Sequence, residues 1–188
     1  MPTYTIFAGV NGAGKTSIYE TIYYEENKLE KRINTDEMVE RLGSWQDNNL
    51  QMRIAREAVK LLNCYINNEI SFNQETTLSG RTIVKNINTA KSKGYHVVMN
   101  YIGVESPDIA KERVRIRVSK GGHGISEDVV ERRYHESLQN LRAVISICDE
   151  LNIYDNTDKF EQIAYIVNGE LRWKSGVLPN WAKDIIKK

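Results

Sequence analysis

The sequence has few of the residues that mark several large classes of protein. Its 188 residues include only two cysteines, Cys64 and Cys148, and three prolines. Two cysteines so far apart exclude a disulfide-rich scaffold and a cysteine-based zinc site. No apolar run approaches the roughly 18 residues that a membrane span requires, and the N-terminus lacks the basic and apolar segments of a secretory signal. We therefore expect a cytoplasmic protein without a membrane partner.

An excess of charge of one sign is also lacking. The chain carries 26 basic and 25 acidic side chains, for a formal net charge of +1. Domains that bind nucleic acids usually show a strong basic excess, so no nucleic-acid partner is expected. Hydrophobic residues make up 40% of the chain, which is enough for a folded core. At about 100–200 residues per domain, we expect one domain over residues 1–188.

Short β-prone runs alternate with amphipathic segments through the first 155 residues. This alternation is typical of a parallel sheet with helices on both faces. Asn168 and Gly169 stand between two later β-prone runs and indicate a type I′ hairpin at the sheet edge or over one face. The expected strands are residues 3–8, 32–36, 71–74, 96–104 and 151–154, and the expected helices are residues 16–24, 37–42, 50–68, 79–93, 107–120 and 126–148.

The most specific pattern follows the first expected strand. Residues 9–16 read GVNGAGKT and fit the phosphate-binding pattern GxxxxGK(S/T). Glycines in such a loop let successive backbone N–H groups point at phosphate oxygens. Lys15 would place a charge near the β- and γ-phosphates, and the Thr16 hydroxyl is the expected ligand of Mg²⁺. The residues expected to bind ATP are Gly9, Asn11, Gly12, Ala13, Gly14, Lys15, Thr16 and Ser17.

These patterns together predict an α/β fold of the P-loop NTPase type. We expect a three-layer sandwich with a mainly parallel sheet, a helical lid near residues 113–134, and a C-terminal hairpin and helix near residues 163–187. A P-loop alone does not say what is done with the phosphate. The most apolar expected strand carries Asn100 instead of the usual Walker-B aspartate, and no guanine-binding NKxD pattern occurs. A GTPase is therefore disfavoured.

Polar residues near the ends of two further strands favour a small-molecule kinase. Asp36 closes the second expected strand, where its carboxylate could accept a proton from an acceptor hydroxyl. The alternative is that Asp36 caps the helix that follows. Glu75 and Thr76 follow the third expected strand, at the carboxyl edge where ligands bind in open α/β folds. The residues expected to bind the acceptor are Asp36, Glu75, Thr76 and Arg81.

Arginines gather on two expected helices that the glycine-rich residues 121–124 connect. A hinged pair of helices with arginines on both arms could close over a transferring phosphate and stabilise its charge. The alternative is a solvent-exposed helix pair whose arginines are neutralised by neighbouring glutamates. The expected lid residues are Arg113, Arg117, His123, Arg132 and Arg133.

These segments together resemble the zeta-toxin-like P-loop kinases. The resemblance runs from Ile6 to Asn156 and rests on GVNGAGKT, RINTDEM, SFNQETTLSG, RVRIRVSKGGHGISEDVVERRY and IYDN, in that order. It implies a kinase that uses ATP and Mg²⁺ to phosphorylate a hydroxyl of a small acceptor, with UDP-N-acetylglucosamine as the candidate. It also implies a protein antitoxin as a candidate partner. The catalytic residues expected from it are Lys15, Asp36, Arg117 and Arg132.

Two other functions fit a P-loop of this kind. A regulatory ATPase or nucleotide-dependent switch would have no small-molecule acceptor, and the missing Walker-B aspartate disfavours it. A non-catalytic nucleotide-binding module would not need Lys15, Thr16 and Asp36 together. The expected function is therefore phosphoryl transfer from ATP to the hydroxyl of a small acceptor.

Overall fold

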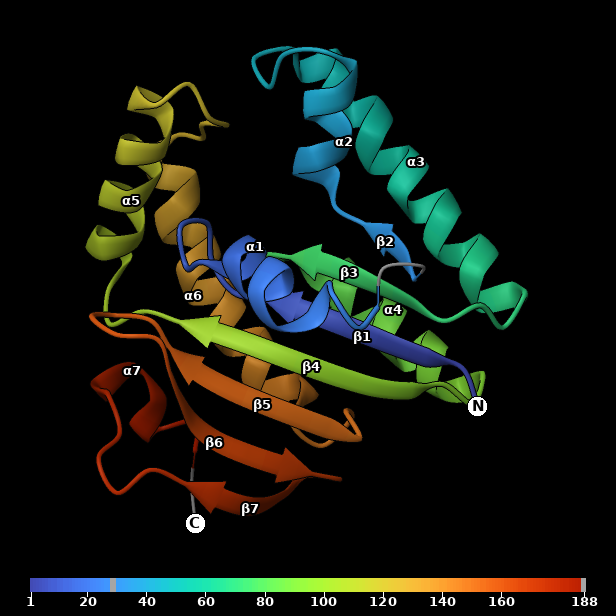
Figure 1. Ribbon diagram of the computed structural model, residues 1–188, viewed down its shortest axis with the longest axis vertical. Coiled ribbons are helices and arrows are strands. Elements are labelled where there is room, and N and C mark those ends of the chain that lie inside the picture. Colours follow the sequence, from blue (N-terminus) through green and yellow to red (C-terminus); the bar gives the residue numbers. More distant parts are fainter. Residues whose placement is uncertain (28–29, 187–188) are drawn as a thin grey trace.

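A computed structural model of the chain describes residues 1–27 and 30–186. Its strands are β1 (Thr3–Ala8), β2 (Lys31–Ile33), β3 (Phe72–Thr76), β4 (His96–Gly103), β5 (Glu150–Asp155), β6 (Glu161–Val167) and β7 (Glu170–Lys174). Within the described residues they form one seven-stranded sheet in the order β2-β3-β1-β4-β5-β6-β7 (Figure 1). Strands β1 to β5 pair in parallel, and β6 and β7 are antiparallel. The expected α/β fold with a mainly parallel sheet is confirmed.

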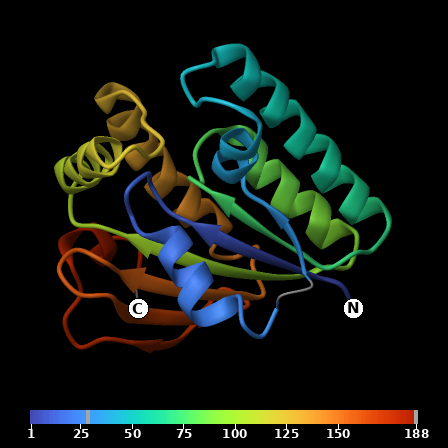
Figure 2. The same ribbon diagram turned by 45° about the horizontal axis from the view of Figure 1, so that its top comes forward.

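Helices cover both faces of this sheet (Figure 2). The short helix α1 (Lys15–Ile18) and its π-helical continuation η1 (Tyr19–Tyr23) lie on one face. The other face is covered by α3 (Asn48–Asn67), α4 (Arg81–Ser92) and α6 (Glu127–Val144). Helices α2 (Thr35–Leu42) and α5 (Pro107–Ser119) project above the sheet on opposite sides of the loop after β1, and α7 (Asn180–Lys183) lies near the C-terminal strands (Figure 1). None of the described helices is long and apolar enough to cross a membrane.

The side chains of β1 divide the core between the two faces, because successive side chains of a strand point in opposite directions. Tyr4 and Ile6 are fully buried in the larger cluster with residues of α3, α4 and α6. The ring of Tyr4 stacks on Phe72 of β3, with 4.4 Å between the centroids. Phe7 points to the other face and meets Tyr19 of η1 edge to face at 5.5 Å. Packing on both faces holds β1, and so the start of the P-loop, in a fixed position.

The C-terminal hairpin extends the sheet at its edge, one of the two positions expected for it. Asn168 and Gly169 have φ angles of +50° and +78°, as the two central residues of a type I′ turn require. Trp181 of α7 packs against Tyr101 of β4, with 5.9 Å between ring centroids. Its indole N–H donates to the Asp155 carboxylate at 2.8 Å. These contacts fasten the last helix to the central strands.

Several element boundaries differ from those expected, and two of the differences move predicted site residues. Strand β3 runs to Thr76, so Glu75 and Thr76 lie inside the strand and not after it. Strand β2 ends at Ile33, and Asp36 lies in the first turn of α2. The predicted helix over residues 16–24 is part π-helical, and the one over residues 126–148 ends earlier, at Val144.

The residue that caps α2 is Asn34. Its side-chain oxygen accepts hydrogen bonds from the backbone N–H groups of Asp36 at 3.0 Å and Glu37 at 3.4 Å. This is the usual N-cap arrangement, and it satisfies two backbone donors that the helix itself cannot. The alternative interpretation of Asp36 as the cap is therefore wrong, and its carboxylate is not engaged at the helix end.

Candidate active site

The P-loop connects β1 to α1 and lies close against neighbouring backbone. Gly9 has a φ of +143°, and a Cβ there would lie 2.2 Å from the carbonyl oxygen of Ile102 in β4. Gly12 has a φ of +80°, and a Cβ there would lie 2.7 Å from the carbonyl oxygen of Ala110 in α5. Only glycine fits at either position without moving backbone. These glycines therefore bring the loop between β4 and the base of the predicted lid.

Lys15 is buried at the centre of the site, with 7% of its surface exposed. Its Nζ donates to the carbonyl oxygen of Val10 within the loop, at 3.1 Å. Burial lowers the pKa of Lys15, and the charges of Arg117 and Arg133 lower it further. The carboxylates of Glu75 and Asp36 act in the opposite direction. Three cations and two carboxylates thus lie close enough to influence one another.

Glu75 lies beside the threonine of the P-loop. The Thr16 hydroxyl is 3.1 Å from each of its two carboxylate oxygens. Strand β3 is the direct neighbour of β1, with Phe7 opposite Glu75, and this pairing brings the carboxylate to the loop. A carboxylate therefore lies beside the P-loop threonine on β3, whereas the sequence pattern had drawn attention to β4, where Asn100 stands.

Two residues of the second strand region hold Glu75 from its other side. Arg32 Nη2 donates to Glu75 Oε2 at 3.0 Å, and Asn34 Nδ2 donates to the same oxygen at 3.0 Å. Both donors also reach Glu37 Oε1, at 2.9 Å each. The sequence analysis missed Arg32, Asn34 and Glu37 as site residues. Arg32 lies inside the three-residue strand β2, and Asn34 and Glu37 follow it; only the pairing of β2 with β3 brings them to Glu75.

Asp36 faces the predicted lid across the cleft, and 44% of its side chain is exposed. The His123 Nε2 lies 3.9 Å from Asp36 Oδ1, which is too long for a direct hydrogen bond. The ring of His123 also packs near Trp45 of the α2–α3 loop, with 5.6 Å between centroids. Burial lowers the pKa of His123, Arg117 and Arg133 lower it further, and Asp36 opposes them. The structure thus brings His123 next to Asp36.

Arg117 and Arg133 are the two predicted lid arginines that line the cleft. Arg117 is unusual, because its Nε and Nη2 are the buried side-chain nitrogens without a hydrogen-bond partner among the described residues. Arg133 Nη1 donates to Asn11 Oδ1 of the P-loop at 3.2 Å. Buried polar groups normally have partners, so the unpaired nitrogens of Arg117 indicate a place for an anion.

The other predicted arginines lie elsewhere. Arg132 is exposed and bonds Glu136 one turn along α6 at 3.0 Å, so its placement in the site is wrong. The physical reason is that adjacent helical residues point about 100° apart, and only Arg133 faces the loop. Arg81 is exposed at the start of α4 and does not line the cleft, so the structure does not bring it to the acceptor side. Arg113 donates to the Thr157 carbonyl oxygen at 2.8 Å.

Two adjoining cavities make up the cleft. One has a volume of about 270 Å³, and Lys15, Glu75 and Arg133 help to line it. The other has a volume of about 360 Å³, and Thr16, Trp45 and Arg117 help to line it. The residues that border both cavities are Asn34, Asp36, Val39 and His123. A carboxylate and a group of cations therefore face one space, which is the arrangement that phosphoryl transfer to a hydroxyl requires.

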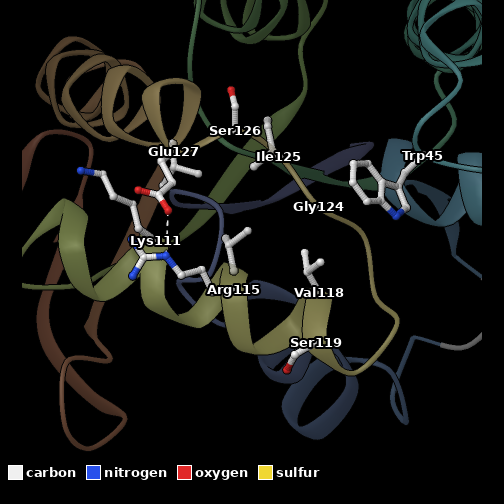
Figure 3. Close-up of a pocket in the computed structure, with 11 residues that line it drawn as sticks. Trp45, Lys111, Arg115, Val118, Ser119, Gly124, Ile125, Ser126 and Glu127 are labelled. Atoms are coloured by element: carbon white, nitrogen blue, oxygen red, sulfur yellow. Dashed lines mark hydrogen bonds and ion pairs between the residues drawn. The ribbon is translucent and has the colours of Figure 1, made fainter.

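A larger cavity of about 540 Å³ lies between α5 and α6 (Figure 3). Val118 and Ile125 stand on its walls with Trp45 on the far side (Figure 3). Arg115 at its edge is paired with Glu127 at 2.7 Å. No residue of the P-loop lines this cavity. It adjoins the charged cleft, because Trp45 and Ile125 each line this cavity and one cavity of the cleft.

Sequence comparison relates the chain to one family. The family model described as Zeta toxin matches residues 1–165. An uncharacterized protein of Haemophilus influenzae is 32% identical to the chain over 128 residues, which cover 68% of this chain and 89% of that protein.

Solved structures share the fold at low sequence identity. The PezAT chromosomal toxin-antitoxin system of Streptococcus pneumoniae matches with a TM-score of 0.65 and 19% identity, over 88% of this chain and 71% of that one. The AvrRxo1-ORF1:AvrRxo1-ORF2 complex with sulphate ions matches with a TM-score of 0.69 and 15% identity, over 91% of this chain. This chain covers only 60% of that chain's length. The same complex has also been solved with ATP, and that structure matches with a TM-score of 0.60.

Proposed function

This chain belongs to the Zeta toxin family, and we propose that it is an ATP-dependent kinase that phosphorylates a hydroxyl of a small acceptor. One observation carries the proposal, namely that Asp36 faces the same cleft as Lys15 and Arg117. A switch or ATPase that acts on water alone does not require an acceptor cavity with a carboxylate at its border. The cations supply the charge that a transferring phosphoryl group needs.

The chemistry proposed for the chain is a direct transfer. Asp36 accepts the proton of the acceptor hydroxyl as its oxygen bonds to the γ-phosphorus, and the bond from that phosphorus to the β–γ bridging oxygen breaks. The products are ADP and the phosphorylated acceptor. Lys15, Arg117 and Arg133 stabilise the negative charge on the phosphoryl oxygens. The lowered pKa of His123 keeps its ring neutral near pH 7, so it does not neutralise Asp36.

The residues near the P-loop fit Mg²⁺. The Thr16 hydroxyl and the Glu75 carboxylate are hard oxygen donors that lie 3.1 Å apart. The described residues contain no group of three or more histidines, cysteines or carboxylates that could hold a metal by themselves. This agrees with a cation that is bound by one or two protein groups together with phosphates and water. When bound, Mg²⁺ would neutralise charge on the β- and γ-phosphates.

The acceptor side of the cleft favours a neutral hydroxylated group. The cavity of about 270 Å³ is lined there by the amides of Gln51 and Gln74 and the hydroxyls of Thr76 and Thr77. Such groups can donate to and accept from sugar hydroxyls. Membership of the Zeta toxin family makes UDP-N-acetylglucosamine the first acceptor to test. The likeness to a toxin-antitoxin system supports a protein antitoxin as a partner.

The direct test is transfer of label from γ-labelled ATP in the presence of Mg²⁺. The acceptor panel contains UDP-N-acetylglucosamine, other nucleotide sugars and nucleosides. We expect a labelled acceptor with the wild type and with Lys60→Ala, whose lysine is 74% exposed on α3, but not with Lys15→Ala. Release of labelled phosphate that depends on Lys15, without any labelled acceptor, would instead support a regulatory ATPase. Tight ATP binding without turnover would support a binding module.

A further inference from the structure

Arg32 lies on the edge strand β2, yet its side chain is held on every side. Only 12% of that side chain is exposed. Its Nη2 is shared between Glu37 and Glu75 at 2.9 and 3.0 Å, and its Nε donates to Glu37 at 3.1 Å. Its Nη1 donates to Asn73 Oδ1 at 3.0 Å. The guanidinium carbon lies 3.5 Å from the centroid of the Tyr19 ring, which covers one face of the group.

A second layer of hydrogen bonds fixes the orientation of Asn73. Its Nδ2 donates to Glu30 Oε2 at 2.8 Å, and so its Oδ1 is turned toward Arg32. The Tyr23 hydroxyl donates to the same Glu30 oxygen at 2.8 Å and lies 3.1 Å from Thr5 Oγ1. The network thus joins β1, β3 and η1, and Arg32 is its connection to the P-loop. Fully paired polar networks of this kind give a group one well-defined position.

The charges explain what the guanidinium does for Glu75. The carboxylates of Glu37 and Glu75 share two donors, Arg32 Nη2 and Asn34 Nδ2, so they lie close together. Two carboxylates at such a separation repel each other unless a cation lies between them. The planar fork of an arginine can serve both carboxylates and the amide of Asn73 at once.

We propose that Arg32 is a positioning residue, which holds Glu75 against the Thr16 hydroxyl and so sets how strongly Mg²⁺ promotes ATP binding. The proposal rests on the proposed function only in taking ATP with Mg²⁺ as the ligand of the P-loop. Arg32 itself lines neither cavity of the cleft, so it acts through Glu75. Residues that orient metal-binding groups typically change metal affinity by about 10–100-fold when they are replaced.

The experiment measures ATP affinity by calorimetry with Mg²⁺ and with EDTA, together with the melting temperature of each variant. The variants are Arg32→Lys, Glu75→Gln and the double variant, with Arg172→Lys of the exposed hairpin as the matched control. We expect Arg32→Lys to bind ATP in EDTA with the affinity of the wild type. The factor by which Mg²⁺ raises its ATP affinity should be about tenfold smaller than in the wild type. The double variant should be no worse than Glu75→Gln, because residues that act as a unit are not additive.

Three results would overturn the proposal. One is a folded Arg32→Lys protein whose ATP affinity rises with Mg²⁺ as much as that of the wild type. Another is a loss of ATP affinity that is equal with Mg²⁺ and with EDTA, which would indicate a structural role alone. The third is an additive loss in the double variant. Should Arg32→Lys fail to fold, Asn73→Ser is the second variant, because it removes one acceptor of the guanidinium. It is also expected to reduce the increase in ATP affinity that Mg²⁺ produces. No transfer is measured, so failure of the proposed kinase activity would be seen separately.

Discussion

The two walls of the cleft differ in how fully their polar groups are paired. On the strand wall, formed by Thr16 and Glu75 with Arg32 behind them, each of these three side chains has partners at 3.0–3.1 Å. On the lid wall, formed by Arg117 and His123, two buried guanidinium nitrogens have no partner among the described residues. His123 lies 3.9 Å from Asp36 and makes only a long contact with it. The polar groups of the strand wall are therefore paired within the protein, whereas the lid wall has guanidinium donors left over for a ligand.

The largest expected effect comes from removing the cation between the two walls. Lys15→Ala should lower transfer by at least about 10³-fold, because no other group can take its place at the phosphates. The melting temperature should not fall, since the variant removes a buried amine whose pKa is lowered by burial and by Arg117 and Arg133. Labelled-ATP kinetics and thermal melting test both statements. Wild-type transfer, or a melting temperature lowered by more than about 4 °C, would contradict them.

The second prediction tests the lid wall alone. Arg117→Ala should lower kcat by about 10²–10³-fold, as expected for removal of one group that stabilises a developing charge. Its thermal stability should stay close to that of the wild type, because two of its buried nitrogens have no hydrogen bond to lose. The check is kcat beside thermal melting with and without ATP. A loss of stability without a change in kcat would show that Arg117 has a structural role instead.

The contrast between the walls also shows what the sequence could predict. The P-loop was predictable because its function lies in eight consecutive residues and in the backbone that they form. The partnership of Arg32 with Glu75 was not, because it depends on which strand pairs with β3 and in what register. Which of Arg132 and Arg133 faces the P-loop could have been predicted from helical periodicity. Arg133 follows Val130 by three residues and precedes Ser137 by four, and both are buried on α6.

The third prediction uses these two arginines as a matched pair. Arg133→Ala should lower kcat/KM by about 10–100-fold, because its guanidinium lines the cleft and bonds Asn11 of the P-loop. Arg132→Ala should stay within about twofold of the wild type, since its exposed ion pair with Glu136 contributes little. Both variants lose the same charge from the same helix. The opposite order of effects would show that Arg132 is the residue at the phosphates.

The smallest expected effect is a pH dependence of stability. The pKa of His123 is lowered from 6.5, chiefly by burial, so the unfolded chain takes up a proton at a higher pH than the folded chain. The stability that depends on a neutral His123 is present above pH 6.5 and is lost as the pH falls below it. Between pH 7.5 and pH 5.5, the melting temperature of His123→Asn should therefore fall less than that of the wild type. Equal falls would contradict a stabilising role for neutral His123.

One measurement tests most directly whether Asp36 acts in phosphate transfer and not in ATP binding. It is the comparison of Asp36→Asn with the wild type in both phosphate transfer and ATP affinity. The variant keeps the shape and cap of α2, so ATP affinity should stay within about twofold, while transfer to the acceptor should fall by about 10²–10⁴-fold. Full transfer by Asp36→Asn, or a parallel loss of transfer and ATP affinity, would contradict the account.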